Sequence, residues 1–561
     1  PAGRGIGHQI MCEEGYAWPG TMVVASDSHS NMYGGMGCLG TPVVRTDAAA
    51  IWATGKTWWQ VPPVAKVELT GSLRKGVTGK DVIVTLCGIF NNDEVLNHAV
   101  EFVGDGVASL GLNERLTIAN MTTEWGALTG LFPVDDVAID WLIERVKFIV
   151  ERGLEGVPSD EDGDGTHPRV RDSRVDDLIA NKERLNADEN AQYAKHLILD
   201  LSTVEPCVSG PNSVKKSSTV ANLSKERIPI QKAYLVSCVN SRLDDIAEAA
   251  QAIQGRKVAD GVEFYIAAAS SEVQKESERL GYWQTLLDAG AKPLPAGCGP
   301  CIGLGAGLLK EGEIGISATN RNFKGRMGSP DAQAYLGSPA VVAASAAVGY
   351  IALPDALSSG GAKATLETVA TEKGAPKKTD LVPGFPDHVL GPLVFCYQDN
   401  MNTDGIYPGK YTYNDDMTGK DQAKVVMENY DPDFRAIARE NDILAGGYNF
   451  GMGSSREQAA TALKHFGIQL VIAGSVGQTY QRNAINNGFV VLESPEFTEA
   501  LKEKFGEFAL TQRSELVVDV SFEDSTIQYE GKTFGFSPLG KPAQEIIVSG
   551  GLEEWIRKSL R

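Results

Sequence analysis

Three cysteines in two segments could bind a metal or exchange electrons. Cys298 and Cys301 form the pair CGPC, and Cys238 lies 60 positions earlier (298 − 238) in the segment SCVNSR. The CxxC pair alone is typical of a thiol redox protein, whereas three cysteines suit zinc with a fourth ligand or an iron–sulfur cluster with one open iron. Spacing leaves these three chemistries open, although neither segment offers a histidine as a fourth zinc ligand.

A second group of residues could move a proton. The segment ASDSHS places Asp27, Ser28 and His29 after a hydrophobic stretch, and His8 lies upstream of it. Glu124 follows the stretch LTIANMTT, so two histidine–carboxylate pairs can form. A carboxylate fixes the tautomer of its imidazole and raises its basicity, which suits proton transfer to or from a hydroxyl group. The alternative is that these histidines are structural.

The segment GMGSSREQAATALKHF could bind an anion. It places Ser454, Ser455 and Arg456 at the start of an expected helix. Free backbone N–H groups, hydroxyls and a guanidinium at that position favour a carboxylate. The alternative is a plain serine N-cap, with Glu457 completing a capping box.

A further basic turn is ATNRNFKGRMG, which contains Asn320, Arg321 and Arg326. In a chain with a formal charge of −20, a pair of arginines beside an asparagine indicates a second anion site. The alternative is an ordinary basic surface loop.

Hydrophobic stretches that end in polar loops must position these residues. We expect strands that run into such loops at 21–29, 64–73, 114–135 and 230–242, and a helix at 80–90. Strands that alternate with helices predict an α/β fold. In such folds ligands bind at the carboxyl ends of the strands, where the candidate residues lie.

The composition excludes several classes of function. The chain has 561 residues, and its formal charge of −20 repels phosphate backbones, so we expect no nucleic acid as a partner. The sequence contains no apolar run of the roughly 20 residues that span a bilayer, so we expect no membrane partner. Eight cysteines in this length favour a reducing compartment over a disulfide framework.

The acidic segment SDEDGDGTH (159–167) looks like the start of an EF-hand loop. The pattern needs a glutamate at the twelfth position, where this chain has Arg171, and Pro168 occupies the ninth. We therefore expect an acidic surface loop here and no calcium site.

Six motifs together resemble the aconitase superfamily over nearly the whole chain. They are, in the order that the family has them, DSHSNMYGGMG, NMTTEWGA, SCVNSR, CGPCIG, TNRNFKGR and GSSRE. The segments QDNMNTDGIYPGKYTYNDDM and AGSVGQTYQRNAINNGF are most similar to the branch of isopropylmalate isomerases and homoaconitases, and within it to the fungal homoaconitases. The resemblance implies three α/β domains around an iron–sulfur cluster and a linked C-terminal swivelling α/β domain.

The domain boundaries follow from the resemblance and the composition. We expect a remnant of the first domain at 1–62, the second domain at 63–225, the third at 226–355, a linker at 356–389 and the swivelling domain at 390–561. We also expect that an N-terminal part of the first domain, together with any targeting segment, precedes Pro1.

The resemblance assigns roles residue by residue. It implies that Cys238, Cys298 and Cys301 hold a [4Fe-4S] cluster. It implies catalytic roles for Ser454, His8, Asp27, His29, Glu124 and Asp404. It implies substrate contacts for Ser28, Asn320, Arg321, Arg326, Ser455, Arg456 and Lys410. Ser454 would remove the proton from carbon, Asp404 would pair with a family histidine upstream of Pro1, and Lys410 would bind the distal carboxylate.

The implied activity is that of a hydro-lyase. It would interconvert homocitrate, cis-homoaconitate and homoisocitrate in lysine biosynthesis through the α-aminoadipate pathway. The expected partner is a small tricarboxylate, the expected state is a monomer, and the expected location is the mitochondrial matrix. The alternatives are a fused isopropylmalate dehydratase, whose cluster segment usually reads CSMC, an aconitase, a thiol oxidoreductase, an inactive fragment and a cluster-free RNA-binding relative.

Overall fold

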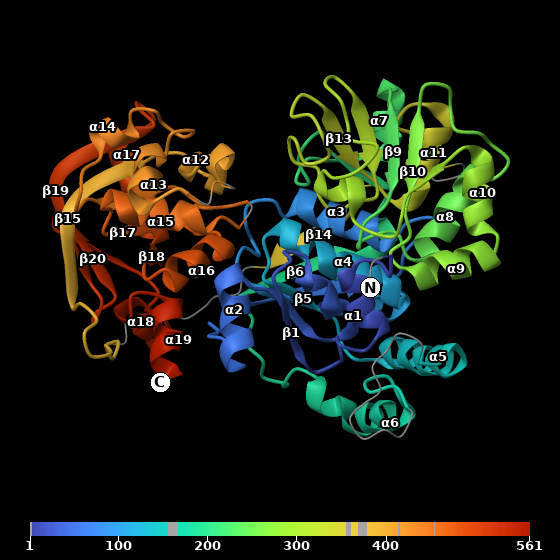
Figure 1. Cartoon of the computed structure of the whole chain (residues 1–561), viewed down its shortest axis with the longest axis horizontal. Helices are drawn as coiled ribbons and strands as arrows, with labels where there is room; N and C mark the ends of the chain where they lie inside the picture. Colours follow the sequence, from blue (N-terminus) through green and yellow to red (C-terminus); the bar gives the residue numbers. More distant parts are fainter. Residues whose placement is uncertain are drawn as a thin grey trace. The chain divides into compact units, whose positions relative to one another are not determined.

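The chain folds into two compact units in the computed structural model (Figure 1). The structure describes residues 3–154, 166–354, 361–367, 378–412, 414, 416–453 and 455–560. Unit 1 comprises Pro1–Pro42 and Pro62–Ala370, and unit 2 comprises Val43–Val61 and Thr371–Arg561. Within the described residues, no helix is both long and apolar enough to span a membrane. Most of the acidic segment 159–167, and Ser454, lie outside the described residues.

Unit 1 contains a two-stranded sheet and a five-stranded sheet. The strands β1 (Met22–Ala25) and β2 (Leu39–Pro42) form a parallel pair. A five-stranded sheet has the order β14 (Ala364–Glu367), β6 (Lys195–Asp200), β3 (Val64–Thr70), β4 (Ala99–Val103) and β5 (Thr129–Leu131). The strands expected within 21–29 and 64–73 are therefore confirmed.

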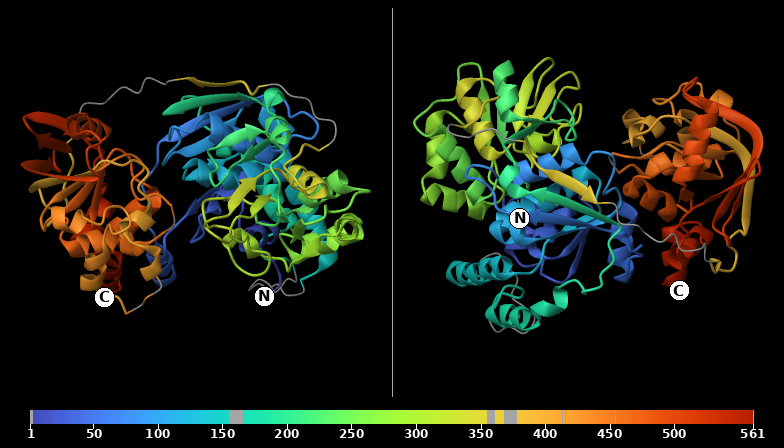
Figure 2. Two further views of the ribbon diagram at one scale, coloured as in Figure 1. Left: turned by 90° about the horizontal axis from the view of Figure 1, so that it is seen from above. Right: turned by 180° about the vertical axis from the view of Figure 1, so that it is seen from behind.

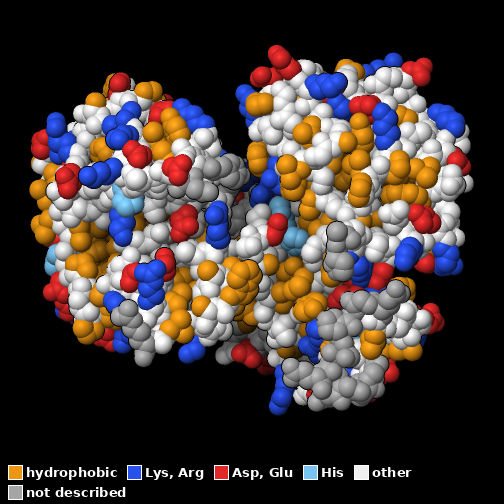
Figure 3. Space-filling model, viewed as in Figure 1, with side chains coloured by type: hydrophobic (Ala, Val, Ile, Leu, Met, Phe, Trp, Pro, Cys, Tyr) orange, Lys and Arg blue, Asp and Glu red, His pale blue; other side chains and the backbone are white. Residues whose placement is uncertain are grey.

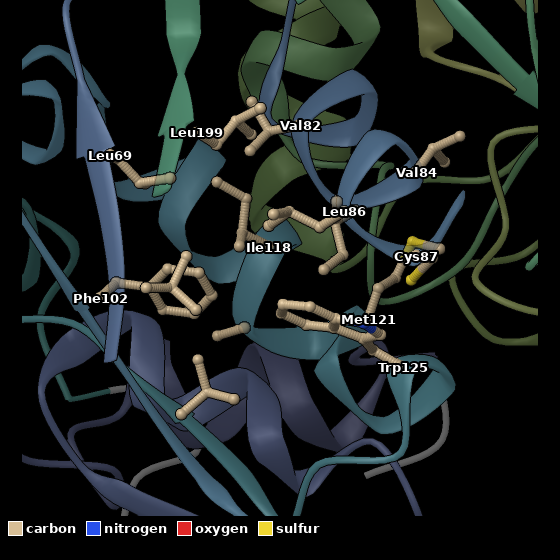
Figure 4. Close-up of a cluster of buried hydrophobic side chains, with 14 of the residues drawn as sticks. Leu69, Val82, Val84, Leu86, Cys87, Phe102, Ile118, Met121, Trp125 and Leu199 are labelled. Carbon is tan, nitrogen blue, oxygen red and sulfur yellow. The ribbon is translucent and has the colours of Figure 1, made fainter. Parts of the chain in front are cut away.

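The five-stranded sheet packs against two helices, α3 (Gly79–Ile89) and α4 (Leu112–Trp125). Leu86 of α3, Ile118 and Met121 of α4, and Phe102 of β4 are fully buried in one core (Figure 4). Burial of each such side chain contributes about 1.5–3 kcal/mol to folding. This core fixes α3 and α4 to the sheet, and α4 carries Glu124.

The position of Glu124 corrects an expectation. The sequence predicted a strand within 114–135, but residues 112–125 form α4, and β5 follows after Gly126, whose φ of 99° ends the helix. Residues 115–122 of this helix are buried on all sides. A helix without a polar face has no 3.6-residue period, so the pattern imitates a buried strand.

A seven-stranded sheet forms the rest of unit 1. Its order is β11 (Lys292–Pro293), β10 (Glu263–Ile266), β9 (Lys232–Leu235), β12 (Ile314–Ser317), β13 (Gln333–Leu336), β7 (Cys207–Ser209) and β8 (Ser217–Thr219). The first five strands are parallel. The helices α8 (Leu243–Ile253), α10 (Tyr282–Ala289) and α11 (Pro339–Val348) cover the sheet (Figure 1). The loops after β9 and β12 carry Cys238 and Asn320.

Part of the expected linker is a strand. Residues 364–367 form β14, which pairs antiparallel with β6 at the edge of the five-stranded sheet (Figure 2). The segments 355–360 and 368–377 on either side lie outside the described residues. The segment as a whole has the Ser/Gly/Ala composition of a linker, so the sequence did not indicate a strand at ATLE. A four-residue edge strand needs little apolar sequence.

Unit 2 is built on a second seven-stranded sheet. Its order is β18 (Val490–Glu493), β17 (Leu470–Ala473), β16 (Ile443–Gly446), β15 (His388–Cys396), β19 (Thr511–Ser521), β20 (Thr526–Tyr529) and β21 (Lys532–Gly535). The helices α15 (Glu457–Phe466), α16 (Gln478–Asn486) and α17 (Pro495–Phe505) follow β16, β17 and β18. The four neighbouring strands from β15 to β18 are parallel, as alternating strands and helices predict.

Residues 43–61 belong to unit 2, whereas the sequence placed them in the first domain. Their helix α2 (Arg45–Thr54) packs on α16 and α19 (Leu552–Ser559). Asp47 and Arg482 are buried and form an ion pair, and Trp58 Nε1 donates to Asn486 Oδ1 at 2.8 Å. Asp47 and Arg482 are 435 positions apart, and local sequence patterns cannot reveal such a contact.

Charged side chains of both signs are interspersed on the visible face of each unit (Figure 3). Although the net charge of the chain is −20, this face also carries lysine and arginine side chains. Local basic groups remain available for an anionic substrate despite the acidic total.

Candidate active site

The three candidate cluster cysteines come from two loops of unit 1. Cys238 follows β9, in a turn where Ser237 has a φ of 110°. Cys298 precedes the short 3-10 helix η5 (Gly299–Ile302), and Cys301 lies inside it. Cys238 and Cys301 are buried, whereas Cys298 is partly exposed. A pair of buried thiols beside a more accessible one is suited to a cofactor that a substrate must reach.

Two asparagine side chains hold the sulfur atoms. Asn120 Nδ2 donates to Cys238 Sγ at 3.2 Å, and Asn320 Nδ2 donates to the same sulfur at 3.6 Å. Cys301 Sγ donates to Asn320 Oδ1 at 3.4 Å, so Asn320 lies between the two loops. Amide donors to a sulfur stabilise it as a thiolate ligand and tune the bound group.

The pKa values of these thiols argue against a redox dithiol. Burial, and then the neighbouring Cys301, raise the pKa of Cys238 to about 12. The same two causes raise the pKa of Cys298 to about 11. A reactive CxxC needs a thiol whose pKa is lowered, so these cysteines are poor nucleophiles. Binding of a metal group would displace their protons.

The donor set fits a cluster better than a single ion. Among the residues that the structure describes, no three histidine, cysteine or acidic side chains are close enough together to hold one metal ion. A cube of four irons and four sulfides keeps its cysteine ligands further apart than one ion does, because each thiolate binds a different iron. Three buried or half-buried thiols with amide donors therefore fit a [4Fe-4S] cluster.

Two histidine–carboxylate pairs lie in the same unit. His8 Nε2, in α1 (Gly7–Glu13), lies 3.2 Å from Asp27 Oδ1. His29 Nε2, at the start of the 3-10 helix η1 (Ser30–Met36), donates to Glu124 Oε1 at 3.0 Å. These are the pairs that the sequence indicated, although Glu124 reaches His29 from the last turn of a helix rather than from a strand end.

The carboxylates of both pairs are held ionised. Burial alone would raise the pKa of Asp27, but hydrogen bonds from His29 and His8 outweigh it and place the pKa well below its usual range. Burial also opposes ionisation of Glu124, and the Arg321 charge and the His29 hydrogen bond lower the pKa below its ordinary value. A carboxylate that stays charged can keep orienting its imidazole through a proton transfer.

Arginine residues tie these groups to the TNRNFKGR segment. Arg321 Nε donates to Glu124 Oε1 at 2.5 Å, and its Nη1 donates to Ser28 Oγ at 3.2 Å. Arg326 Nε donates to the carbonyl oxygen of Cys301 at 2.8 Å. Arg321 thus contacts the group of histidines and carboxylates, and Arg326 contacts the loop that carries Cys301.

Two residues at this site were not found from the sequence. Asn120 lies one helical turn before Glu124, and a helix would have placed both on one face, but the strand expected at 114–135 concealed this. Tyr33 is buried, and its ring stacks on His8 with centroids 5.8 Å apart and an angle of 21° between the planes. The motif DSHSNMYGG contains Tyr33 but gives no signal of what it contacts.

Unit 2 groups the remaining candidates. Arg456, the N-cap residue of α15, pairs with Asp404 at 2.6 Å. Ser455 Oγ accepts from Asn483 Nδ2 at 3.2 Å. The serine N-cap alternative is wrong, because Arg456 occupies that position and Glu457 begins the helix. Ser454, the predicted base, lies outside the described residues.

Asp404 and Lys410 lie in the loop region after β15. Asp404, in the short helix α12 (Thr403–Ile406), also accepts from the backbone N–H of Gly409 at 2.7 Å. Lys410 is exposed, and its Nζ donates to Glu428 Oε1 at 2.6 Å. A role of Lys410 in binding a distal carboxylate requires that it leave Glu428.

Comparisons with known proteins identify the family. The aconitase family (aconitate hydratase) matches residues 1–349, and the aconitase C-terminal domain matches residues 365–497. The chain belongs to the aconitase family. Membership of the aconitase family confirms the predicted α/β fold, a hydro-lyase activity and a [4Fe-4S] cluster as the cofactor.

Members of the family from fungi match the whole chain. The mitochondrial homoaconitases of Debaryomyces hansenii and Candida albicans are each 56% identical to it, and that of Cryptococcus neoformans is 55% identical. The alignments cover 100% of this chain and 82%, 83% and 83% of those proteins. These family members confirm the resemblance to fungal homoaconitases.

Two solved structures match parts of the chain. The 3-isopropylmalate dehydratase of Methanocaldococcus jannaschii is 28% identical, with a TM-score of 0.27, over 31% of this chain and 95% of that one. The aconitase X of Thermococcus kodakaraensis is 12% identical, with a TM-score of 0.28, over 54% of this chain and 62% of that one.

Proposed function

We propose that this aconitase-family chain is a homoaconitate hydratase of the mitochondrial matrix, in the α-aminoadipate pathway of lysine biosynthesis. It interconverts homocitrate, cis-homoaconitate and homoisocitrate, and acts as a monomer without a nucleic-acid partner. The observation that carries the proposal is 54–56% identity, over the entire chain, to proteins named mitochondrial homoaconitase. The proposal is also supported by the three cysteines with their asparagine donors and by the two histidine–carboxylate pairs.

Cys238, Cys298 and Cys301 hold the [4Fe-4S] cluster. Because three thiolates serve four irons, the bound cluster supplies one iron as a Lewis acid for the substrate hydroxyl and carboxylate. Asn120 and Asn320 keep the sulfur of Cys238 oriented through their amide groups. Their hydrogen bonds also favour the charged thiolate over the thiol.

The two histidine–carboxylate pairs handle the proton of the departing hydroxyl. His8 Nε2 lies 3.2 Å from Asp27 and His29 Nε2 lies 3.0 Å from Glu124. His29 Nδ1 lies 3.4 Å from the same Asp27 Oδ1, so one carboxylate faces both imidazoles. Asp27 and Glu124 stabilise the imidazolium that forms when a proton is taken up. Arg321, held by Glu124 and Ser28, presents its remaining guanidinium edge to a substrate carboxylate.

The proposal also gives roles to four residues of the sequence range of unit 2. Ser454, acting as an alkoxide, takes the proton from the substrate carbon. Asp404 holds Arg456 in place through the 2.6 Å ion pair. Lys410 binds the distal carboxylate of the substrate.

The test is a comparison of substrates by the full-length protein after anaerobic reconstitution with iron and sulfide. We expect hydration of cis-homoaconitate with a kcat/KM at least about tenfold above those for cis-aconitate and isopropylmaleate, since an extra methylene in a fitted pocket is worth about 1–3 kcal/mol. Faster hydration of isopropylmaleate would assign the chain to the isopropylmalate dehydratases, and faster hydration of cis-aconitate would assign it to the aconitases. RNA retention on a filter at moderate salt would contradict the absence of a nucleic-acid partner.

A further inference from the structure

Lys80 is a fully buried lysine beside the loops that carry the cluster ligands. It belongs to the first turn of α3 and has 0% of its surface exposed. Its Nζ donates to the carbonyl oxygen of Thr319 at 2.6 Å and to that of Ala318 at 3.3 Å. The third acceptor is Asn240 Oδ1 at 3.4 Å. The amine thus has three oxygen acceptors, which matches its three donors.

These acceptors lie on both loops that approach the cluster sulfurs. Asn240 is two residues after Cys238, in the loop that follows β9. Thr319 immediately precedes Asn320, whose amide donates to Cys238 Sγ at 3.6 Å. One ammonium group therefore ties the loop of a cluster ligand to the loop that orients the ligand sulfur.

The groups that accept hydrogen bonds from Lys80 carry no charge of their own. All three of its hydrogen-bond acceptors are neutral oxygens, and burying an ammonium group is costly unless charges of opposite sign lie nearby. Burial lowers the pKa of Lys80 to about 8, while Asp245, then Cys301, Asp81 and Cys238, raise it. Asn240 links Lys80 to Asp245: its Oδ1 accepts from Lys80 Nζ, and its Nδ2 donates to Asp245 Oδ1 at 2.8 Å.

Two of the groups that raise the pKa of Lys80 are cluster cysteines. As protonated thiols they carry no charge, but as ligands of a [4Fe-4S] cluster they belong to an anionic group. A cluster of net negative charge would add to the countercharge of Asp245 and Asp81, and Lys80 would in turn act on the cluster. Net charge nearby and hydrogen bonding are two of the properties that set the reduction potential of such clusters.

We infer that Lys80 is a positioning residue for the cluster, which holds the Cys238 and Asn320 loops together and raises the reduction potential of the bound cluster through its positive charge. The inference rests on the cluster ligands named in the proposed function. It extends that function to a residue that touches neither the substrate nor an iron.

The chain offers a matched control in Lys232. This lysine lies in β9 of the same unit and is 2% exposed, but its Nζ pairs with Glu313 rather than with the cysteine loops. The variants Lys80→Met and Lys80→Gln remove the charge, and Lys80→Gln keeps an N–H donor for the carbonyls. Lys232→Met removes an equally buried lysine away from the cluster.

Two measurements on the anaerobically reconstituted proteins test the inference. The first is the midpoint potential of the cluster in an EPR-monitored redox titration, and the second is the rate at which a chelator removes iron. We expect more negative potentials in Lys80→Met and Lys80→Gln than in the wild type. We also expect about tenfold faster iron loss in Lys80→Met, the range in which groups that support metal ligands act.

Lys232→Met should match the wild type in both measurements. The inference is overturned if both Lys80 variants show the potential and the iron loss of Lys232→Met. If Lys80→Met fails to fold, Lys80→Gln decides the question through its potential. A wild-type protein that binds no iron would overturn the proposed function itself, which is a different result from an iron-loaded wild type with unchanged Lys80 variants.

Discussion

His29 Nε2 lies 3.0 Å from Glu124 Oε1, and the same oxygen accepts a hydrogen bond from Arg321 Nε at 2.5 Å. One carboxylate oxygen therefore serves both a histidine and an arginine. It orients the imidazole and neutralises the guanidinium, so the proposed proton-transfer residue His29 and the proposed carboxylate-binding residue Arg321 both depend on Glu124.

Replacement of Glu124 tests this dependence. Glu124→Gln keeps the size of the side chain but removes its charge, so it no longer stabilises His29 as an imidazolium. We expect kcat to fall about 100-fold, within the range of general acid–base effects. Steady-state kinetics at constant iron content measure this, with Glu144→Gln at an exposed ion pair as the control. If Glu124→Gln had the same kcat as the control variant, Glu124 would have no role in catalysis.

Tyr33 positions His8 through ring stacking rather than through its hydroxyl group. Tyr33→Phe keeps the stacked ring and should retain kcat within about twofold, whereas Tyr33→Leu loses it and should lower kcat about tenfold. The KM values should change little, because the contact is to His8 and not to the substrate. Equal activity of the two variants would show that the ring does not position His8.

The buried pair between Asp47 and Arg482 stabilises unit 2. Asp47→Ala leaves the Arg482 guanidinium buried without its carboxylate, which costs about 3–5 kcal/mol. Chemical denaturation followed by fluorescence measures the loss. Glu553→Ala, at an exposed pair with Arg557, is the control and should cost at most about 1 kcal/mol. Comparable losses in the two variants would mean that residues 43–61 add little to unit 2.

The stability of unit 1 should depend on pH through Glu14, which ends the helix that carries His8. Burial opposes its ionisation, but hydrogen bonds from Arg152, His167 and Arg4 outweigh it and lower its pKa from 4.5 to about 2. Because the folded pKa lies below the unfolded one, this stabilisation is present above about pH 4.5 and is lost as the pH falls towards 2.

The variant Glu14→Gln isolates this contribution. Its free energy of unfolding should be lower than that of the wild type at pH 7, and the difference should shrink steadily below pH 4.5. Denaturant titrations at several pH values between 7 and 3 measure the difference. A difference that stays constant across this range would mean that the ion pairs of Glu14 do not stabilise the fold.

The parts of the site that depend on strand ends were predictable from the sequence. Cys238 after β9 and Asp27 after β1 follow short apolar strands that end in polar loops, and that pattern is local. Helix α4 was not predictable in this way, because its burial on all sides removes the period that marks a helix. The missed role of Asn120 follows from the same cause.

Contacts between distant segments were also beyond the sequence. The strand β14 pairs with β6 from within a composition typical of linkers, and α2 packs with α16 from more than 400 positions away. Lys80 belongs to a helix that the sequence did predict, but its acceptors come from loops 160 and 239 positions later. Such contacts depend on how sheets and helices pack and not on local pattern.

We propose that Cys238, Cys298 and Cys301 hold a [4Fe-4S] cluster with one iron open to the substrate. Mössbauer spectroscopy of the iron-57-reconstituted full-length protein, before and after addition of homoisocitrate, tests it most directly. We expect the spectrum of one iron of the four to change when homoisocitrate is added, while the spectra of the other three stay the same. Four irons that do not respond to substrate, or a protein that retains zinc and no iron, would contradict it.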